Sequence, residues 1–329
     1  MHKKALILGI GGQDGYYLTE LLYGKGYKVW GVLRSADMSE ETLTGLQGKA
    51  DLLEGDICDR VFMAKAISEL RPHEVYNLAG ISFIPLSWER PGLVGEVNGS
   101  AVGRILELIR TNLPEARFFQ AGSSEMFGHD PAESPQNEDT PFRPDNPYAS
   151  AKVFASHLVT NYRKHFNLFA CTGILYNHES PRRGLQFVTR KITHAAAEIY
   201  LGRQKVLALG DLQASRDWSY AEDTVHAMWL MLQQNEPGDF VIGSGRLHTI
   251  EDCLDVAFSR LGLKWQDHVR IDSEYVRPRE TKPLLADSGW ARDVLSWRPQ
   301  VEFEELIEMM VEAEMRFLEK SAVCLRDQE

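Results

Sequence analysis

The sequence predicts an α/β fold, in which a doubly wound parallel sheet is joined to a smaller C-terminal lobe. Over residues 1–176, short apolar runs alternate with helical patterns, which is typical of a sheet built from strand–helix–strand units. The apolar runs are continuous, as expected for strands that helices cover on both faces. After about residue 177 the alternation ends, which indicates a second lobe.

Six strands are expected in the N-terminal half, at residues 4–10, 28–33, 51–54, 74–79, 117–121 and 169–176. Helical patterns separate them, near residues 15–25, 60–70, 97–111 and 148–166. Parallel strands need such crossover connections, so the order of elements itself favours a parallel sheet.

The C-terminal half opens with a polar segment, residues 177–184, which holds two arginines and a proline and is predicted to be an ordered loop. Beyond it we expect helices at 189–201, 221–234, 250–261 and 303–319, and strands at 206–209 and 239–242. The last of these strands should return to the main sheet. We therefore expect a dinucleotide-binding domain of residues 1–176, to which 210–245 return, interleaved with a mainly substrate-binding lobe of residues 177–329.

Composition narrows the class of protein. The chain has 329 residues, of which 43% are hydrophobic and 25% charged, and its net charge is −11 without any basic block. These values are ordinary for a globular protein and argue against a nucleic-acid partner. No apolar stretch approaches the roughly 18 residues of a membrane span, and the short run after the basic N-terminus ends in glycines, unlike a signal peptide.

The cysteines lack any spacing typical of a metal site or a disulfide framework, so we expect no metal and a reducing compartment, the cytoplasm. They are Cys58, Cys171, Cys253 and Cys324.

Three glycines mark a cofactor site. Gly9, Gly12 and Gly15 follow the first strand and open the first helix, in the spacing G-x-x-G-x-x-G. Glycine permits the tight turn and the close approach of a pyrophosphate, which then lies at the helix N-terminus. With Gln13 and Asp14 between them, they predict a Rossmann-type dinucleotide site.

The residue after the second strand favours NADP. NAD-binding proteins usually carry an acidic residue there to bind the ribose hydroxyls, whereas this chain has Arg34, which suits a 2′-phosphate. A solvated surface arginine is the alternative. Asp56 follows the third strand and is expected at the adenine edge, or else in a simple turn or helix cap.

Tyr148 and Lys152 predict the chemistry. Asn146-Pro147 marks a helix start, and the i, i+4 spacing places the phenol and the ammonium on one helical face. The lysine cation is expected to lower the tyrosine pKa, so that the phenolate removes a proton from a hydroxyl while a nicotinamide takes the hydride. Alone, this spacing is usually a surface coincidence, but here it follows a dinucleotide motif.

Longer motifs extend the picture: Gly12 to Gly15, Val75 to Ala79, Ser123-Ser124-Glu125, Ile174 to Gly184, Phe187 to Lys191, Arg216-Asp217-Trp218 and Arg277 to Glu280. With these motifs the chain resembles the GDP-mannose 4,6-dehydratases, a branch of the extended short-chain dehydrogenases/reductases. The resemblance runs from about residue 5 to about residue 319, and the run Asn-His-Glu-Ser-Pro at 177–181 is its most specific part.

The resemblance implies roles for individual residues. The catalytic positions are Ser123, Glu125, Tyr148 and Lys152. Beside the glycine loop, Arg34 and Asp56, the cofactor positions include Ile57, Leu78, Tyr148, Lys152, His178 and Arg183. The positions for the GDP-sugar are Asn177, Lys191, Arg216, Arg277 and Glu280.

The implied reaction oxidises C4 of GDP-D-mannose, eliminates water across C5 and C6 with Glu125 as acid/base, and returns the hydride to C6. This chain departs from the family at Ser123, where threonine is commoner, and at Gly11 and Gly80, which are smaller than usual. A shortened arginine–serine run at Arg34-Ser35 leaves a homodimer as plausible as a homotetramer. A GDP-heptose 4,6-dehydratase, a GDP-sugar reductase or epimerase, and a catalytically silent NADP sensor remain alternatives.

Overall fold

The computed structural model describes residues 2–272 and 283–326, and it confirms the doubly wound parallel sheet. Seven strands pair in the order β10-β6-β5-β4-β1-β2-β3, and every pairing in this sheet is parallel. The strands are β1 (Lys4–Leu8), β2 (Lys28–Leu33), β3 (Asp51–Glu54), β4 (Glu74–Asn77), β5 (Arg117–Ala121), β6 (Ala170–Leu175) and β10 (Phe240–Ile242).

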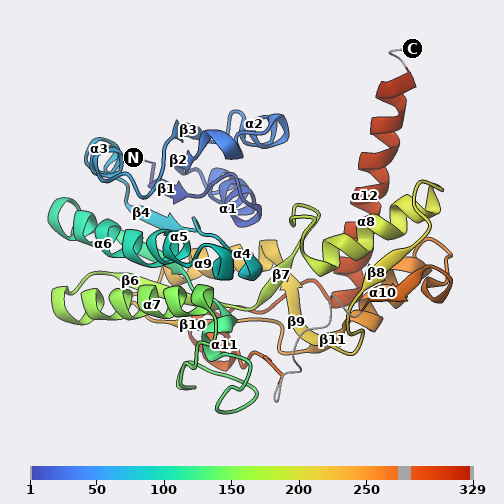
Figure 1. Cartoon of the computed structure of the whole chain (residues 1–329). Helices are drawn as coiled ribbons and strands as arrows, with labels where there is room; N and C mark the ends of the chain where they lie inside the picture. The colour runs from blue at the N-terminus through green and yellow to red at the C-terminus, as the bar shows by residue number, and fades with distance from the viewer. Residues whose placement is uncertain (1, 273–282, 327–329) are drawn as a thin grey trace.

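Helices cover both faces of this sheet, which explains why its strands are continuously apolar (Figure 1). One face packs against α1 (Gln13–Gly24), α9 (Ala221–Met231) and α11 (Gly289–Leu295). The other packs against α3 (Arg60–Leu70), α6 (Ala101–Asn112) and α7 (Pro147–Phe166). Shorter helices fill the connections: η1 (Ser35–Asp37), α2 (Glu40–Leu46), α4 (Ile84–Glu89), α5 (Pro91–Gly95), η2 (Glu96–Ser100), η3 (Ser124–Phe127) and η4 (Trp265–Asp267).

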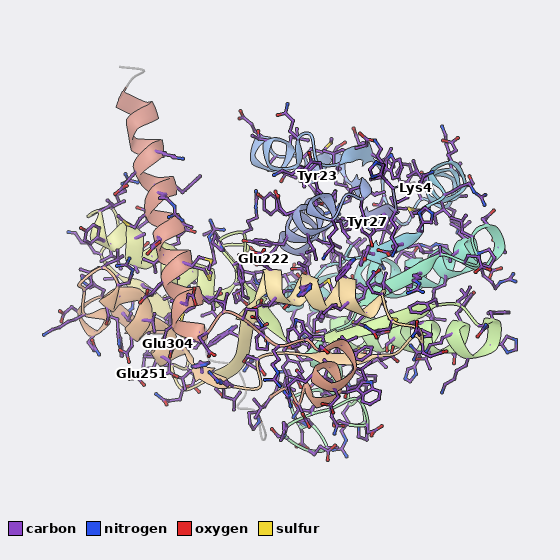
Figure 2. The ribbon with its side chains drawn as sticks, turned by 180° about the vertical axis from the view of Figure 1, so that it is seen from behind. Lys4, Tyr23, Tyr27, Glu222, Glu251 and Glu304 are labelled. Atoms are coloured by element: carbon purple, nitrogen blue, oxygen red, sulfur yellow. The ribbon has the colours of Figure 1, made fainter. Side chains whose placement is uncertain are left out.

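A second hydrophobic core lies in the C-terminal half. It is built from α8 (Val188–Tyr200), α10 (Ile250–Ser259) and α12 (Phe303–Arg326) around two small sheets. The sheets are formed by β7 (Asn177–Glu179), β8 (Leu207–Leu209), β9 (Ser215–Tyr220), β11 (Leu247–Thr249) and β12 (Val269–Ile271). Acidic Glu222, Glu251 and Glu304 lie in the first turns of α9, α10 and α12, where the helix dipole favours negative charge (Figure 2).

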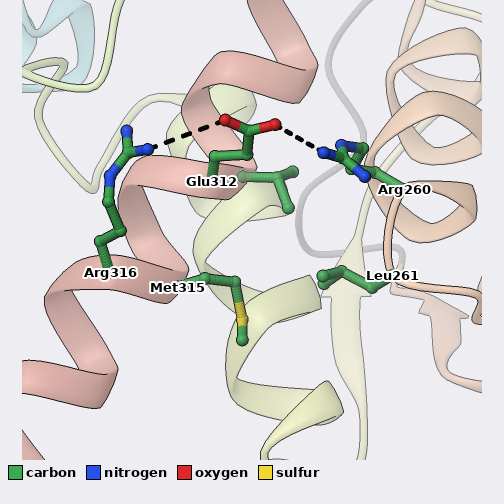
Figure 3. Close-up of a pocket in the computed structure, with 6 residues that line it drawn as sticks. Arg260, Leu261, Glu312, Met315 and Arg316 are labelled. Carbon is green, nitrogen blue, oxygen red and sulfur yellow. Dashed lines mark hydrogen bonds and ion pairs between the residues drawn. The ribbon is translucent and has the colours of Figure 1, made fainter.

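The long helix α12 is joined to α10 by charged side chains. Oε1 of Glu312 lies 2.6 Å from Nη2 of Arg260, and its Oε2 lies 3.7 Å from Nη1 of Arg316. All three side chains line a pocket of about 310 Å³ (Figure 3). Beyond this contact the C-terminal part of α12 projects from the body (Figure 1). None of the helices in the described part of the chain combines the length and apolar character that a membrane crossing needs.

Two element predictions need correction. Residues 177–179 form strand β7, not a loop, because they pair in parallel with β9. The helix predicted over 97–111 is split: Glu96–Ser100 is a π-helical turn and the regular helix begins at Ala101. β9, β11, β12 and the short helices α2, α4, α5 and α11 were not anticipated. Apart from β9, their runs are too short for periodicity to show.

Candidate active site

The helix α7 carries the central pair. Asn146 caps its N-terminus by accepting a hydrogen bond from the backbone amide of Ala149 at 2.8 Å, and Pro147 occupies the first turn. The sequence-predicted face is therefore real, and it turns inward: Tyr148 is 7% exposed and Lys152 is 5% exposed. A surface coincidence is excluded by this burial.

Lys152 is held at the end of β5. Its ammonium donates a hydrogen bond to the carbonyl oxygen of Ala121 at 2.8 Å and lies 5.8 Å from the centre of the Tyr148 ring. Burial lowers the pKa of Lys152 to about 8, against the opposing influence of the Asp14 carboxylate. The amine thus keeps most of its positive charge at neutral pH while remaining close to losing a proton.

The expected lowering of the Tyr148 pKa is not found. Burial raises the pKa of Tyr148 to about 12, although a hydrogen bond with Ser123 and the charge of Arg183 act in the other direction. The prediction was wrong because it considered a cation one turn away and ignored the desolvation of the phenolate, which is larger here. Tyr148 is therefore a phenol in this structure.

Ser123 and Glu125 meet this phenol from the short helix η3, which follows β5. Ser123 is its N-cap, and the hydroxyl accepts a hydrogen bond from the Glu125 amide at 3.3 Å while also bonding Tyr148. Glu125 acts on Tyr148 electrostatically, raising its pKa, so the two groups are close. Oε2 of Glu125 accepts a hydrogen bond from Asn146 at 3.4 Å. The structure thus gathers all four residues expected to be catalytic.

The glycine loop has the geometry of an anion cradle. Gly9 has φ +82°, and a Cβ there would lie 2.8 Å from the Ala79 backbone, so only glycine fits. A Cβ on Gly12 would meet nothing closer than 3.5 Å, so the space above this residue is open. Gly12 is the N-cap of α1 and provides no side-chain cap, which leaves the first amides of the helix available to a phosphate. Gly15 packs tightly on Ile10, which seats the helix against the strand.

Polar side chains bind the start of α1 to strand β7. Oδ2 of Asp14 lies 2.9 Å from Nε2 of His178, and the side-chain amide of Gln13 donates a hydrogen bond to the backbone carbonyl of His178 at 3.0 Å. Ser180 donates to Oε1 of Gln13 at 2.7 Å. Burial opposes both charges, yet the pairing lowers the pKa of Asp14 and raises that of His178. His178 is therefore held by Asp14 in this structure.

Arg183 lies on the same side of the site. Its Nε is 3.2 Å from Oε2 of the buried Glu179, and its guanidinium stacks on Phe187 with 3.7 Å to the ring centre. Its charge reaches Asp14 and Tyr148, whose pKa values it lowers. The loop after β7 thus contributes a fixed cation between the glycine cradle and the phenol.

Arg34 lies just beyond β2 as expected, but its fork is engaged. Nε and Nη2 donate to the two carboxylate oxygens of Asp37 at 2.8 and 3.0 Å, and this contact raises the Arg34 pKa. A 2′-phosphate would have to take the place of that carboxylate. Asp37 was therefore missed as a member of this site, although it follows Arg34 by one turn of η1.

The other cofactor positions surround the carboxyl ends of the strands. Asp56 accepts a hydrogen bond from the Cys58 amide at 2.8 Å, so the turn interpretation applies to it. Ile57 is buried in the core. Leu78 continues β4 and donates its amide to the Leu8 carbonyl at 3.0 Å. In the described ranges no three His, Cys, Asp or Glu side chains converge as a metal site would require.

The positions expected for the GDP-sugar lie in the C-terminal half. Asn177 is on β7, Lys191 is on α8 with Nζ 2.9 Å from the Ala208 carbonyl, and Arg216 is on β9. Buried Asp217 fixes β9 beside Arg216 by accepting from the amides of Ser244 at 2.7 Å, Gly245 at 2.9 Å and Ala286 at 3.0 Å. Arg277 and Glu280 lie outside the described residues.

Solved structures share this fold over nearly the whole chain. A UDP-glucose 4-epimerase of Thermotoga maritima, solved with UDP-glucose, superposes with a TM-score of 0.86 at 22% identity, covering 96% of this chain and 99% of the other. A dTDP-glucose 4,6-dehydratase of Bacillus anthracis, solved with NAD, gives 0.84 at 18% identity, covering 96% and 98%. These likenesses define the class by its fold, which the chain shares with these epimerases and dehydratases.

Within that class, the GDP-mannose 4,6-dehydratase family model matches residues 6–310. The chain is 46% identical to GDP-mannose 4,6 dehydratase 2 of Arabidopsis thaliana, over 98% of this chain and 90% of the relative. It is 40% identical to the human GDP-mannose 4,6 dehydratase, over 95% and 92%. The protein belongs to the GDP-mannose 4,6-dehydratase family.

Proposed function

We propose that this protein converts GDP-D-mannose to GDP-4-keto-6-deoxy-D-mannose, as an NADP-dependent hydro-lyase. Family membership supports the substrate, and the structure supports the chemistry through one observation: Glu125, Ser123 and Tyr148 meet at the carboxyl edge of the sheet. A plain dehydrogenase or epimerase needs only the tyrosine and lysine. An additional carboxylate beside the phenol suits the removal of a C5 proton and the protonation of a departing C6 hydroxyl.

A bound nicotinamide supplies the acceptor for the hydride that leaves C4 and the donor for the hydride that arrives at C6. The glycine cradle and the uncapped amides of α1 suit its pyrophosphate, and Arg34 suits the 2′-phosphate of NADP once Asp37 is displaced. Residues 1–176, to which residues 210–245 return, form the domain that binds the dinucleotide. Residues 177–329 form the lobe that mainly binds the GDP-sugar.

Burial raises the pKa of Tyr148 to about 12, so the phenol must first lose its proton to solvent before it can act as a base. The Lys152 ammonium, 5.8 Å from the ring centre, favours the phenolate, which then takes the proton of the sugar 4-hydroxyl as the hydride leaves C4. Ser123 bonds Tyr148 and is placed to bond the same sugar hydroxyl. Glu125 then exchanges protons at C5 and C6. Proton transfer by a positioned group contributes about 10² to 10⁴-fold to each step.

The nucleotide end of the substrate needs cations. Lys191 and Arg216 project from α8 and β9 and are assigned to the diphosphate, for which Arg offers bidentate contact. Asn177 and Glu280 are assigned to the sugar or the base, and Arg277 to the diphosphate.

A homodimer or homotetramer is also part of this proposal. Three large apolar side chains on α4, α5 and α7 are exposed: Trp88 by 63%, Leu93 by 44% and Phe154 by 50%. These helices contact one another, and a second copy of the chain could cover the three exposed side chains. Light scattering coupled to gel filtration measures the number of copies.

The described thiols, Cys58, Cys171 and Cys253, are free, which suits the cytoplasm.

Incubation of the protein with GDP-mannose and NADP, followed by mass spectrometry and NMR of the sugar, tests the proposed function. The product should have lost one molecule of water and should carry a methyl group at C6. A product that keeps its 6-hydroxyl would point instead to a reductase or epimerase, and turnover of a GDP-heptose alone would reassign the substrate.

A further inference from the structure

The side chain of Asn146 faces two functional elements at once. It is 4% exposed, and its Oδ1 accepts the hydrogen bond from the Ala149 amide that caps α7. This contact fixes the orientation of the side-chain amide, because the partner is a donor. The NH₂ group therefore points the other way, 3.4 Å from Oε2 of Glu125 and 3.3 Å from Oδ1 of Asp145.

The backbone around Asn146 is locked to the segment that carries Glu125. The Arg143 amide donates to the Met126 carbonyl at 2.9 Å, and the His129 amide donates to Oδ2 of Asp145 at 2.8 Å. Gly128, with φ +77°, lies so close that a Cβ would be 2.0 Å from the Arg143 carbonyl oxygen. These contacts, made by the residues that directly follow Glu125, leave little freedom in how Asn146 approaches its carboxylate.

We propose that Asn146 is a positioning residue for acid/base catalysis, which holds the Glu125 carboxylate beside Tyr148 and keeps it ionised. The inference rests on the proposed function, since only water elimination requires Glu125. The side-chain amide of Asn146 then connects the N-terminus of α7, which bears Tyr148 and Lys152, to the Glu125 carboxylate.

The surroundings of Glu125 explain why such a donor is needed. Tyr148 faces it from α7, with its proton retained, and Asp145 brings a second carboxylate to the same amide. The Asp145 carboxylate repels a negative charge on Glu125, and a protonated Glu125 could not remove the C5 proton. A hydrogen bond donated to the carboxylate favours the ionised form.

Two substitutions separate positioning from helix capping. Asn146→Asp and Asn146→Ser both retain an oxygen that can cap α7, so thermal unfolding should change little. In heavy water, native enzyme should place deuterium at C5 of the product. We expect Asn146→Ser to slow this incorporation about tenfold or more, which is less than the roughly 10² to 10⁴-fold lost when the proton-transfer group itself is removed. Asn146→Asp should also move the acid limb of the incorporation rate upward by about one pH unit, because it sets a carboxylate against Glu125.

A matched control is Asp59→Asn, the reverse exchange at another helix N-cap. Asp59 caps α3 by accepting hydrogen bonds from the backbone amides of Val61 and Phe62. It should leave C5 labelling unchanged. Native rates of C5 labelling in both Asn146 variants would overturn the inference. It would also be overturned if both variants lost the same rate, kept the native acid limb and had a lower melting temperature, since Asn146 would then only cap α7. If native enzyme forms no 4-keto-6-deoxy product, the proposed function fails first, and this inference with it.

Discussion

Asp14 and His178 form a partly buried ion pair across 164 residues of sequence, and the partners of the imidazole define its charge. Nε2 faces the Asp14 carboxylate, and Nδ1 lies 2.7 Å from the Tyr176 carbonyl oxygen. Both partners are acceptors, so both ring nitrogens must donate and His178 is an imidazolium. The pair therefore joins the first turn of the cofactor helix to strand β7 by charge as well as by hydrogen bonds.

This pair predicts how stability depends on pH. The lowered pKa of Asp14 gives stability above its unfolded value of about 4 that disappears as pH falls through the folded value. The raised pKa of His178 gives stability below about 6.5 that disappears as pH rises through the folded value. Asp14→Asn should therefore cost most between about pH 4 and 6.5, by roughly 1–3 kcal/mol, and less at pH 9. Urea unfolding across this range measures the difference, and a loss independent of pH would contradict the ion pair.

Tyr148→Phe keeps the buried ring and removes the hydroxyl. We expect the oxidation of C4 to slow by about 10² to 10⁴-fold in single-turnover absorbance measurements of the reduced nicotinamide. Stability should change little, because the desolvation cost of the phenol hydroxyl is removed together with its hydrogen bond to Ser123. Unaltered affinity for the cofactor is the control, and near-native turnover would remove Tyr148 from the mechanism.

Glu125→Gln is nearly isosteric but cannot accept the C5 proton. Because Tyr148 and Lys152 are untouched, the variant should still oxidise C4 and then stop before water is lost. Reduced nicotinamide should accumulate on the enzyme and absorb in the near ultraviolet, and C5 should not exchange with heavy water. Formation of the 4-keto-6-deoxy sugar at native speed would show that another group is the acid/base.

The contact between Arg34 and Asp37 predicts a tunable cofactor preference. Both side chains are about half exposed, so the ion pair is weak, and Asp37→Asn should free Arg34 and tighten NADP binding about two- to fivefold. Arg34→Ala should weaken NADP binding and leave NAD binding nearly unchanged. Fluorescence titration of the protein with both cofactors measures these constants. Equal affinity of the native protein for NAD and NADP would contradict the assignment of Arg34 to a 2′-phosphate.

Local spacing was sufficient for several features of the site. The three glycines between a strand and a helix, and the tyrosine and lysine one turn apart, depend on neighbours within a few residues, and their geometry follows from regular secondary structure. The glycine loop at the start of α1 and the shared face of Tyr148 and Lys152 on α7 were therefore predictable. Sequence reasoning used Asn146 only to mark a helix start, although an N-cap followed by Pro147 and Tyr148 already placed a polar side chain beside the phenol.

By itself, the sequence determined the parallel sheet and where its first six strands lie along the chain, because continuous apolar runs carry that information. Short motifs also predicted which side chains react. Only the tertiary structure decided how those side chains are charged and held. The pKa of Tyr148 rises because packing removes water from the phenol, and Asn146 meets Glu125, 21 positions earlier in the sequence, because the segment between η3 and α7 folds back on η3. Desolvation and contacts between distant segments arise only when the chain is compact, so no local pattern encodes them.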